Sequence, residues 1–211
     1  MTSRKLHNRL SRLIYLLFIE PFLSAAKKRM LSLIAGRGKI RVLEVGCGTC
    51  VQAALIAREG MSVTAVDLSE KLLPSLFSPR LPPTLRFFQA DGLDLPFQNG
   101  EFDLALISMV LHEMDSAHRI PVLRETMRVV KDDGILLIMD FDFKLESDWK
   151  WPALIIRGIE KMAGKEHHSN FRNFLANGGV HALLQTFSHL PCKRHAILLN
   201  RGGIFEVGIE K

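Results

Sequence analysis

The sequence predicts an α/β fold: a mostly parallel, seven-stranded sheet, doubly wound by helices on both faces, with an antiparallel final strand. Two observations support this prediction. Short apolar runs alternate with segments whose apolar residues recur every three or four positions, as in parallel strands buried between helices. The last two apolar runs are joined by only a short glycine-containing turn, so they should form a hairpin in which the final strand reverses direction.

The length and composition of the chain fit one domain with a small addition. Of the 211 residues, 47 % are apolar and 24 % are charged, which is ordinary for a globular protein. Apolar residues at helical spacing run from Leu23 to Ile34, and the glycines at positions 36 and 38 end that helix. We therefore expect a helical N-terminal extension or cap at residues 1–38 and the main domain at residues 39–211.

The first half of the main domain should alternate strand and helix. Strands are expected at residues 41–45, 62–66 and 85–88, and helices at residues 51–59 and 69–76. Gly60 ends the first of these helices, and Ser69 can cap the second. Three prolines between positions 79 and 83 then break the chain before the third strand.

The second half continues the alternation and ends in the hairpin. Strands are expected at residues 103–107, 135–139, 195–199 and 204–209, and helices at residues 116–130 and 152–163. Asp115 or Ser116 can cap the helix that begins near position 116, and residues 131–134 form the turn into the next strand. A short amphipathic segment at residues 170–175 is expected to form a lid or wall over a substrate pocket.

Glycines and polar residues follow four of the predicted strands. Gly46 and Gly48 follow the first, Asp67 the second, Asp91 the third and Ser108 the fourth. An open α/β sheet binds its ligand beyond the carboxyl ends of its strands, at the point where the strand order reverses. These residues are therefore expected to line one ligand site.

The pattern favours a cofactor that contains adenosine but no pyrophosphate. The two glycines allow a tight turn and a close approach to the ligand, and Asp67 follows about 20 residues later, the spacing of an acid that binds ribose hydroxyls. The third glycine of the dinucleotide fingerprint is replaced by Val51, which would obstruct a pyrophosphate. Glu44 would repel a pyrophosphate but suits a ligand with an amino group and a sulfonium.

Three segments resemble a known family. Val-Leu-Glu-Val-Gly-Cys-Gly-Thr at 42–49 resembles the first motif of class I S-adenosylmethionine-dependent methyltransferases, which have a Rossmann-like fold. Ala-Asp-Gly-Leu-Asp-Leu-Pro-Phe at 90–97 and the stretch 102–114 resemble the subgroup of ubiquinone and menaquinone C-methyltransferases, and residues 123–138 match that subgroup's next helix and strand. The resemblance covers roughly residues 40–141.

The resemblance implies a methyltransferase that uses S-adenosylmethionine and releases S-adenosylhomocysteine. It also implies a set of cofactor-binding residues: Glu44, Gly46, Cys47 and Gly48 for the methionine part, Asp67 for the ribose, Leu68, Asp91 and Gly92 for the adenine, and Ser108 and Met109 beside the sulfonium. The implied acceptor is a small or medium-sized molecule. Its apolar or aromatic, quinone- or lipid-like character is our hypothesis, based on the apolar residues at 15–22 near the expected pocket mouth.

One residue departs from the family pattern. Cys50 stands where the family usually has glycine, and its side chain could tighten the cofactor pocket. With Cys47 it forms a C-x-x-C pair, for which a redox or metal role is the alternative. A metal site would need further ligands at suitable spacing, so we expect no metal.

Two residues are candidates for catalysis. His112 follows the fourth strand, beside the expected methyl group, and could act as a general base on an oxygen or carbon nucleophile. Tyr15, the only tyrosine, lies in the N-terminal segment that could cover the pocket. A packing role is the alternative for His112. His167 and His168 precede the segment at 170–175, and a metal role for this pair is an alternative that we do not favour.

The net charge of +6 and the basic N-terminus leave other partners open. An RNA methyltransferase is the enzymatic alternative, although residues 108–111 differ from the Asn/Asp-Pro-Pro-aromatic motif of many enzymes that methylate base amino groups. A non-catalytic S-adenosylmethionine-binding module is the second alternative. No nucleic acid partner is favoured. Peripheral membrane contact through the basic, apolar first helix is compatible with catalysis.

The cysteine count indicates a reducing compartment. Three cysteines do not make a disulfide framework, so a cytoplasmic location is expected. The apolar run at 13–19 is only seven residues long and ends at Glu20, too short for a secretory signal or a membrane-spanning helix.

Overall fold

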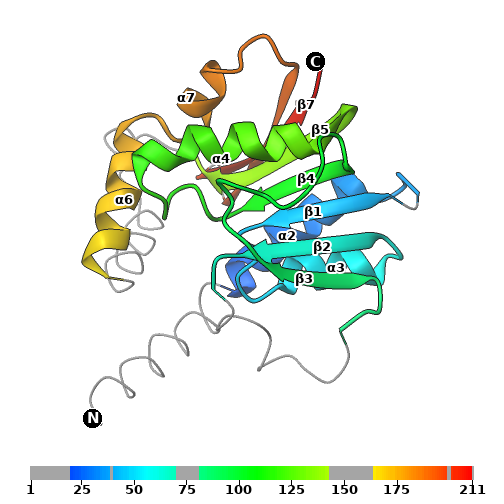
Figure 1. Ribbon diagram of the computed structural model, residues 1–211. Helices are drawn as coiled ribbons and strands as arrows, with labels where there is room; N and C mark the ends of the chain where they lie inside the picture. Colours follow the sequence, from blue (N-terminus) through cyan, green and yellow to red (C-terminus); the bar gives the residue numbers. More distant parts are fainter. Residues whose placement is uncertain (1–19, 39, 70–80, 143–163, 199–200, 211) are drawn as a thin grey trace.

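The computed structural model describes residues 20–38, 40–69, 81–142, 164–198 and 201–210 (Figure 1). Tyr15, most of the helix expected at 69–76 and the whole helix expected at 152–163 lie outside the described residues. No helix in the described ranges has the length and hydrophobicity to cross a membrane.

Seven strands form one sheet in the order β3-β2-β1-β4-β5-β7-β6. Their bounds are Arg41–Val45 (β1), Ser62–Asp67 (β2), Leu85–Gln89 (β3), Phe102–Ser108 (β4), Val130–Phe141 (β5), Cys192–Ile197 (β6) and Gly202–Gly208 (β7). The first five strands pair in parallel, while β7 lies between β5 and β6 and runs antiparallel to both. The predicted fold class, including the antiparallel final strand, is confirmed.

Side chains alternate between the two faces of the sheet, so two hydrophobic cores form. In β4, Ala105 and Ile107 belong to one core, while Leu104 and Leu106 belong to the other. The same alternation separates Leu136 and Ile138 of β5 from Leu137 and Met139. Because both faces are covered, the central strands are continuous apolar runs, as the sequence indicated.

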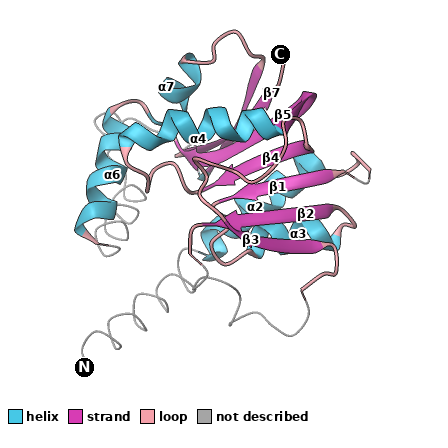
Figure 2. Cartoon of the chain, in the orientation of Figure 1, coloured by secondary structure: helices cyan, strands magenta, loops and turns pink. Residues whose placement is uncertain are grey.

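Five described helices cover these faces (Figure 2). Their bounds are Glu20–Ile34 (α2), Val51–Arg58 (α3), Ser116–Val129 (α4), Lys165–Ala176 (α6) and Gly179–Gln185 (α7). Core residues of α2 and α3 belong to one cluster and those of α4, α6 and α7 to the other. The Asp115 side chain accepts a hydrogen bond from the Ala117 amide and caps α4, which resolves the choice between Asp115 and Ser116.

The inward face of α2 packs into the core of the main domain. Ala26, Met30 and Ile34 are buried in the cluster that α2 shares with α3 and the sheet. The described part of the expected 1–38 extension is therefore in close contact with the sheet, and the division of the chain at residue 38 stays a prediction.

Two local predictions are corrected. The turn expected at residues 131–134 is instead an irregularity within β5, because the pairing steps from Phe102–Val130 to Leu104–Ile135 and places the intervening residues in a bulge. Helix α7 was not predicted, because its seven residues begin at the second of two glycines and are too few to show a clear period.

The strand order reverses between β1 and β4. From β1 the chain proceeds to β2 and β3 on one side, then crosses to β4 on the other side of β1. The loops that leave β1 and β4 therefore diverge, and a crevice opens where a ligand can enter.

Candidate active site

The glycine turn after β1 bends sharply over the end of β2. The amides of Gly46 and Cys47 both donate to the carbonyl of Val66, at 2.9 and 3.0 Å. Gly46 has a φ of 73°, and a Cβ there would lie 2.6 Å from a methyl group of Val110. Glycine is required at position 46 by both its backbone conformation and its packing.

Asp67 fixes the glycine turn to β2. One carboxylate oxygen accepts from the Gly48 amide at 2.8 Å, and the other accepts from the Ser69 amide at 2.9 Å. Each oxygen keeps a second lone pair, and the side chain faces the crevice. Asp67 can therefore hold the turn and still accept hydrogen bonds from a ligand.

A cavity of about 560 Å³ lies at the ends of these strands. This volume is in the range of small-molecule and cofactor sites. All ten residues predicted to bind the cofactor line it: Glu44, Gly46, Cys47, Gly48, Asp67, Leu68, Asp91, Gly92, Ser108 and Met109. The structure thus brings together side chains and backbone from four strand ends, whereas their binding roles stay a prediction.

Two buried oxygens on this cavity lack a hydrogen-bond partner among the described residues. They are Oε2 of Glu44 and Oε1 of Gln52. Burial, followed by the proximity of Cys50, raises the pKa of Glu44 from 4.5 to about 8, and the nearby Lys27 amine acts in the opposite direction. The cavity therefore presents acceptors that suit a donor, and above all a cationic donor.

The cysteine pair lies in the loop between β1 and α3. The Sγ atoms of Cys47 and Cys50 are 3.0 Å apart and both residues are buried. The hydrogen bond with Cys50, together with burial, raises the pKa of the Cys47 thiol. No third ligand group joins these sulfurs at metal-binding distance in the described part of the chain. The expectation that the pair holds no metal stays a prediction.

Cys50 occupies a backbone conformation that favours glycine. Its φ is 55° and its ψ is 22°, at the position preceding α3. This left-handed conformation explains why the resembling family usually has glycine here. Met109, at the end of β4, also has a positive φ, of 58°, and its amide donates to the Met139 carbonyl at 2.7 Å. Residues with a left-handed backbone thus lie in the loops that follow both β1 and β4.

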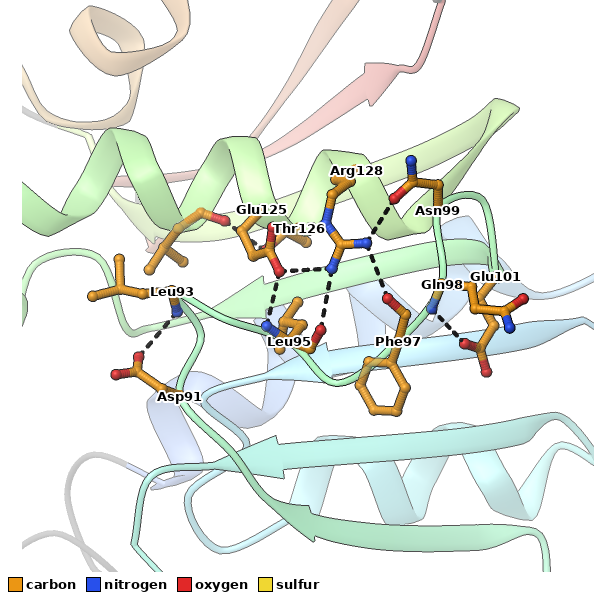
Figure 3. A network of polar contacts seen from close by, with 11 residues as sticks. Asp91, Leu93, Leu95, Phe97, Gln98, Asn99, Glu101, Glu125, Thr126 and Arg128 are labelled. Atoms are coloured by element: carbon orange, nitrogen blue, oxygen red, sulfur yellow. Dashed lines mark hydrogen bonds and ion pairs between the residues drawn. The ribbon is translucent and has the colours of Figure 1, made fainter.

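The loop after β3, which contains Asp91 and Gly92, is held by an arginine on α4 (Figure 3). Arg128 donates to the carbonyls of Leu95 and Phe97 and forms two hydrogen bonds with the carboxylate of Glu125. That carboxylate also accepts from the Leu95 amide. Asp91 itself accepts from the Leu93 amide at 2.9 Å, which shapes the turn at the cavity edge.

His112 lies behind the cavity wall rather than on it. His112 is 2 % exposed, and its Nδ1 is 2.7 Å from Oδ1 of the fully buried Asp140. The other ring nitrogen, Nε2, is 3.8 Å from the carboxylate of Glu113, which does line the cavity. The catalytic role of His112 stays a prediction; Asp140 holds Nδ1, and Nε2 lies on the side of Glu113.

Helix α6 forms an aromatic layer behind this histidine. Phe171 and Phe174 are buried, and Phe171 contacts the rings of His112 and Phe141. The predicted wall at residues 170–175 thus lies within α6, next to His112, with its apolar side facing the core. His167 lies one turn earlier on the same helix, with its ring centroid 5.7 Å from that of His112.

Buried Arg119 ties α6 to the loop after β4. Its guanidinium donates to the carbonyls of Leu111, Met114 and Asn170 and to the side-chain oxygen of Asn173. Asn170 in turn donates to the carbonyl of Glu113 at 2.8 Å. These hydrogen bonds fix α6 against the residues that follow β4.

Several site residues were not predicted from the sequence. Lys27 lies on the otherwise apolar stripe of α2, four positions after Leu23, and this placement was the available signal. Gln52 likewise lies on the buried side of α3. Asp140 and Glu113 gave no such signal, because their relevance depends on contacts between distant segments.

Comparisons with known proteins identify the central segment. Residues 43–138 match the family described as a methyltransferase domain. An uncharacterized methyltransferase of Synechocystis sp. is 34 % identical over 117 residues, which cover 55 % of this chain and 53 % of that protein. A demethylmenaquinone methyltransferase of Beutenbergia cavernae is 30 % identical over 115 residues, covering 54 % and 46 %. The chain spans about half the length of these curated relatives.

A solved structure supports the fold over nearly the whole chain. The 1,6-didemethyltoxoflavin-N1-methyltransferase of Burkholderia thailandensis, with 1,6-didemethyltoxoflavin and S-adenosylhomocysteine bound, has a TM-score of 0.61. It is 18 % identical, and the match covers 98 % of this chain and 88 % of that one. At this identity the likeness concerns the fold alone.

The predicted family resemblance is confirmed. Residues 43–138 match the methyltransferase-domain family, and the relatives of this segment include proteins named demethylmenaquinone methyltransferases. S-adenosylmethionine is accordingly the cofactor that belongs to this family.

Proposed function

We propose that this chain transfers the methyl group of S-adenosylmethionine to a small or medium-sized, apolar or aromatic acceptor of quinone- or lipid-like character. The two buried oxygens of Glu44 and Gln52 on a cavity at the strand ends are the observation on which this proposal depends. Acceptor atoms buried without partners cost free energy unless a ligand donates to them. The α-amino group of S-adenosylmethionine is such a donor, and it carries the positive charge that Glu44 favours.

The remaining cavity residues suit the other parts of this cofactor. Lys27 would pair with the carboxylate of the methionine part, and the amides of the glycine turn allow its close approach. Asp67 would accept from the ribose hydroxyls with the lone pairs that its backbone contacts leave available. Leu68, 68 % exposed at the cavity edge, and Gly92 would contact the adenine, with Asp91 accepting from its amino group.

When bound, the cofactor supplies a methyl group on a sulfonium, which an acceptor atom displaces in line with the departing sulfur. The chain has to orient the acceptor and exclude water, and orientation alone can contribute roughly 7–11 kcal/mol. Ser108 and Met109 border the reacting end. We keep His112 as the candidate base, because Asp140 holds its Nδ1 and Nε2 lies beside Glu113, which borders the cavity.

The proposed acceptor class rests on two observations. Glu113 borders the cavity together with the apolar side chains of Met109, Val110 and Met114, beside which a polar acceptor would find few partners. The relatives with quinone-related names, such as the demethylmenaquinone methyltransferase of Beutenbergia cavernae, point to the same chemistry.

Calorimetry with S-adenosylmethionine tests the cofactor half of the proposal. We expect Asp67→Ala to weaken binding by about tenfold or more, because a hydrogen bond to a charged group contributes roughly 1.5–3 kcal/mol. Methylthioadenosine, which lacks the amino acid part, should bind the wild type more weakly than the full cofactor. Equal affinities of wild type and Asp67→Ala would remove Asp67 from the site.

An acceptor screen tests the second half. Demethylated naphthoquinols with and without an isoprenoid tail are compared with hydrophilic catechols and with RNA, and methyl transfer is followed by mass spectrometry. Transfer to the naphthoquinols supports the proposed class. Transfer only to charged, hydrophilic acceptors would contradict it, and RNA binding that weakens steeply with salt would favour the nucleic-acid alternative.

A further inference from the structure

Three metal-ligating side chains converge beside the proposed acceptor site. One nitrogen each of His112 and His167 and a carboxylate oxygen of Glu113 all lie within 4.8 Å of one another. His112 and Glu113 come from the loop after β4, and His167 comes from the first turn of α6. Because these segments are far apart in the sequence, the spacing of residues gave no sign of the group.

The separations fit a single metal ion. Nε2 of His112 is 3.8 Å and Nδ1 of His167 is 4.0 Å from Oε1 of Glu113. Ligands bound at about 2.0–2.2 Å around one ion lie roughly 3–4 Å apart. All three atoms lie within 4.8 Å of one another, and the Glu113 and His167 side chains, 54 % and 20 % exposed, have room to move the remaining distance toward a shared ion.

Asp140 supplies the second, independent observation. It is fully buried, and its Oδ1 lies 2.7 Å from Nδ1 of His112. A neutral histidine held in this way carries its proton on Nδ1 and directs the lone pair of Nε2 toward Glu113 and His167. Metal-binding histidines are commonly oriented by such a carboxylate on the opposite ring nitrogen.

Hydrogen bonds hold the loop after β4, which carries His112 and Glu113, against helix α6, which carries His167. Asn170 of α6 donates to the Glu113 carbonyl at 2.8 Å, and Arg119 donates to the carbonyls of Met114 and Asn170. The ring of Phe141 packs edge-on against His112, with centroids 4.9 Å apart. The group therefore does not depend on mobile surface side chains alone.

We propose that His112, Glu113 and His167 bind one divalent transition-metal ion at the acceptor end of the cavity. Two imidazoles and one carboxylate suit Zn²⁺, Fe²⁺, Co²⁺ or Ni²⁺ rather than Mg²⁺ or Ca²⁺. Three protein ligands leave at least one coordination position open, and Glu113 borders the cavity. Metal binding is independent of the proposed function. Only the use of the open coordination position to hold an acceptor oxygen rests on the proposed function. When the metal is bound, His112 acts as a ligand and not as a base.

Co²⁺ titration of the full chain, stripped of metal with a chelator, tests the site through visible absorption and calorimetry. We expect one equivalent of Co²⁺ to bind with the absorption bands of a site of low coordination number, and excess Zn²⁺ to displace it. His167→Ala and Glu113→Gln should each lower the affinity by about tenfold or more, and Asp140→Asn should lower it by about 10–100-fold. His118→Ala, an exposed histidine on α4, is the matched control and should bind as the wild type does.

Two outcomes would overturn the site. One is the absence of stoichiometric Co²⁺ or Zn²⁺ binding by a folded wild type. The other is binding that survives His167→Ala and Glu113→Gln but is lost in Cys50→Ser, which would place the ion at the cysteine pair. Calorimetry with S-adenosylmethionine on the metal-free chain separates this result from the proposed function, because the cofactor residues are distinct from the three ligands.

Discussion

At the residue scale, Glu44 links stability to ligand binding. Its carboxyl is buried beside the cavity, and burial followed by the proximity of Cys50 raises its pKa to about 8 in the folded chain, against 4.5 for an ordinary glutamate. The folded state therefore holds a proton that the unfolded state releases. The residue best suited to a cationic ligand is thus one whose ionised form costs stability when no ligand is present.

This gives a pH prediction with a definite sign. Below pH 4.5 the Glu44 carboxyl is protonated in both the folded and the unfolded state, and its contribution to the free energy of unfolding is fully present. This contribution is lost as the pH rises toward 8. We expect Glu44→Gln, which cannot ionise, to gain stability relative to the wild type between pH 5 and 8, by on the order of a few kcal/mol. Urea unfolding at each pH, without cofactor, measures the difference. A constant difference across this range would contradict the buried-proton account.

Gly46 and Gly48 form a matched pair for the cavity turn. Both have positive φ, but a Cβ at Gly46 would strike Val110, whereas one at Gly48 would meet nothing within 4 Å. We expect Gly46→Ala to lose on the order of 2–4 kcal/mol, from the left-handed backbone and the clash together, and Gly48→Ala about 1–2 kcal/mol from the backbone alone. Equal losses in chemical denaturation would show that packing at Val110 does not restrict position 46.

At the element scale, the hydrogen bonds of Arg128 position the loop that follows β3. The guanidinium joins α4 to the carbonyls of Leu95 and Phe97 and to Asn99, while Glu125 binds both the arginine and the Leu95 amide (Figure 3). A planar, forked donor serves several acceptors at once, which an ammonium group cannot reproduce.

We therefore expect Arg128→Lys to loosen this loop. The predicted loss of stability is about 1–3 kcal/mol, with faster amide hydrogen exchange at residues 90–101 and several-fold weaker binding of S-adenosylmethionine. Arg124→Lys is the control, because Arg124 is exposed one turn earlier on α4 and its guanidinium lies over the ring of Phe187, away from the loop. Hydrogen exchange in residues 90–101 that is unchanged by Arg128→Lys would contradict the positioning role.

At the scale of the whole molecule, the cavity joins strand ends on both sides of the topological switch. Residues from β1, β2 and β4, the loop after β3 and helix α2 all border it. A ligand bound there contacts segments that come together only in the folded chain, so it should stabilise the molecule as a unit.

The expected size of this effect follows from mass action. At a concentration of one hundred times its dissociation constant, S-adenosylmethionine should raise the free energy of unfolding by about 2.7 kcal/mol. At the same concentration, an Asp67→Ala variant that binds the cofactor tenfold more weakly should gain only about 1.4 kcal/mol in its free energy of unfolding. Urea unfolding with and without the cofactor measures both gains, and methionine alone is the control. Equal gains in the two proteins would contradict the ribose-binding role of Asp67.

The sequence by itself determined the parallel strands, the position of the ligand crevice and ten of the residues that line it. Each of these depends on short-range information: apolar runs with a period of two or about 3.6, glycines directly after a strand, and an acid at the end of the next strand. Because parallel strands end on one edge of a sheet, residues at successive strand ends, such as Gly46 and Asp67, become neighbours without further information.

The tertiary structure alone decided which distant side chains meet. Asp140 faces His112 only because β5 pairs with β4, and His167 reaches Glu113 only because Arg119 and Asn170 hold α6 against the loop after β4. It also decided that Lys27 and Gln52 border the cavity and that Cys50 takes a left-handed backbone. These outcomes depend on packing between segments many residues apart, and such packing leaves no periodic trace in the sequence.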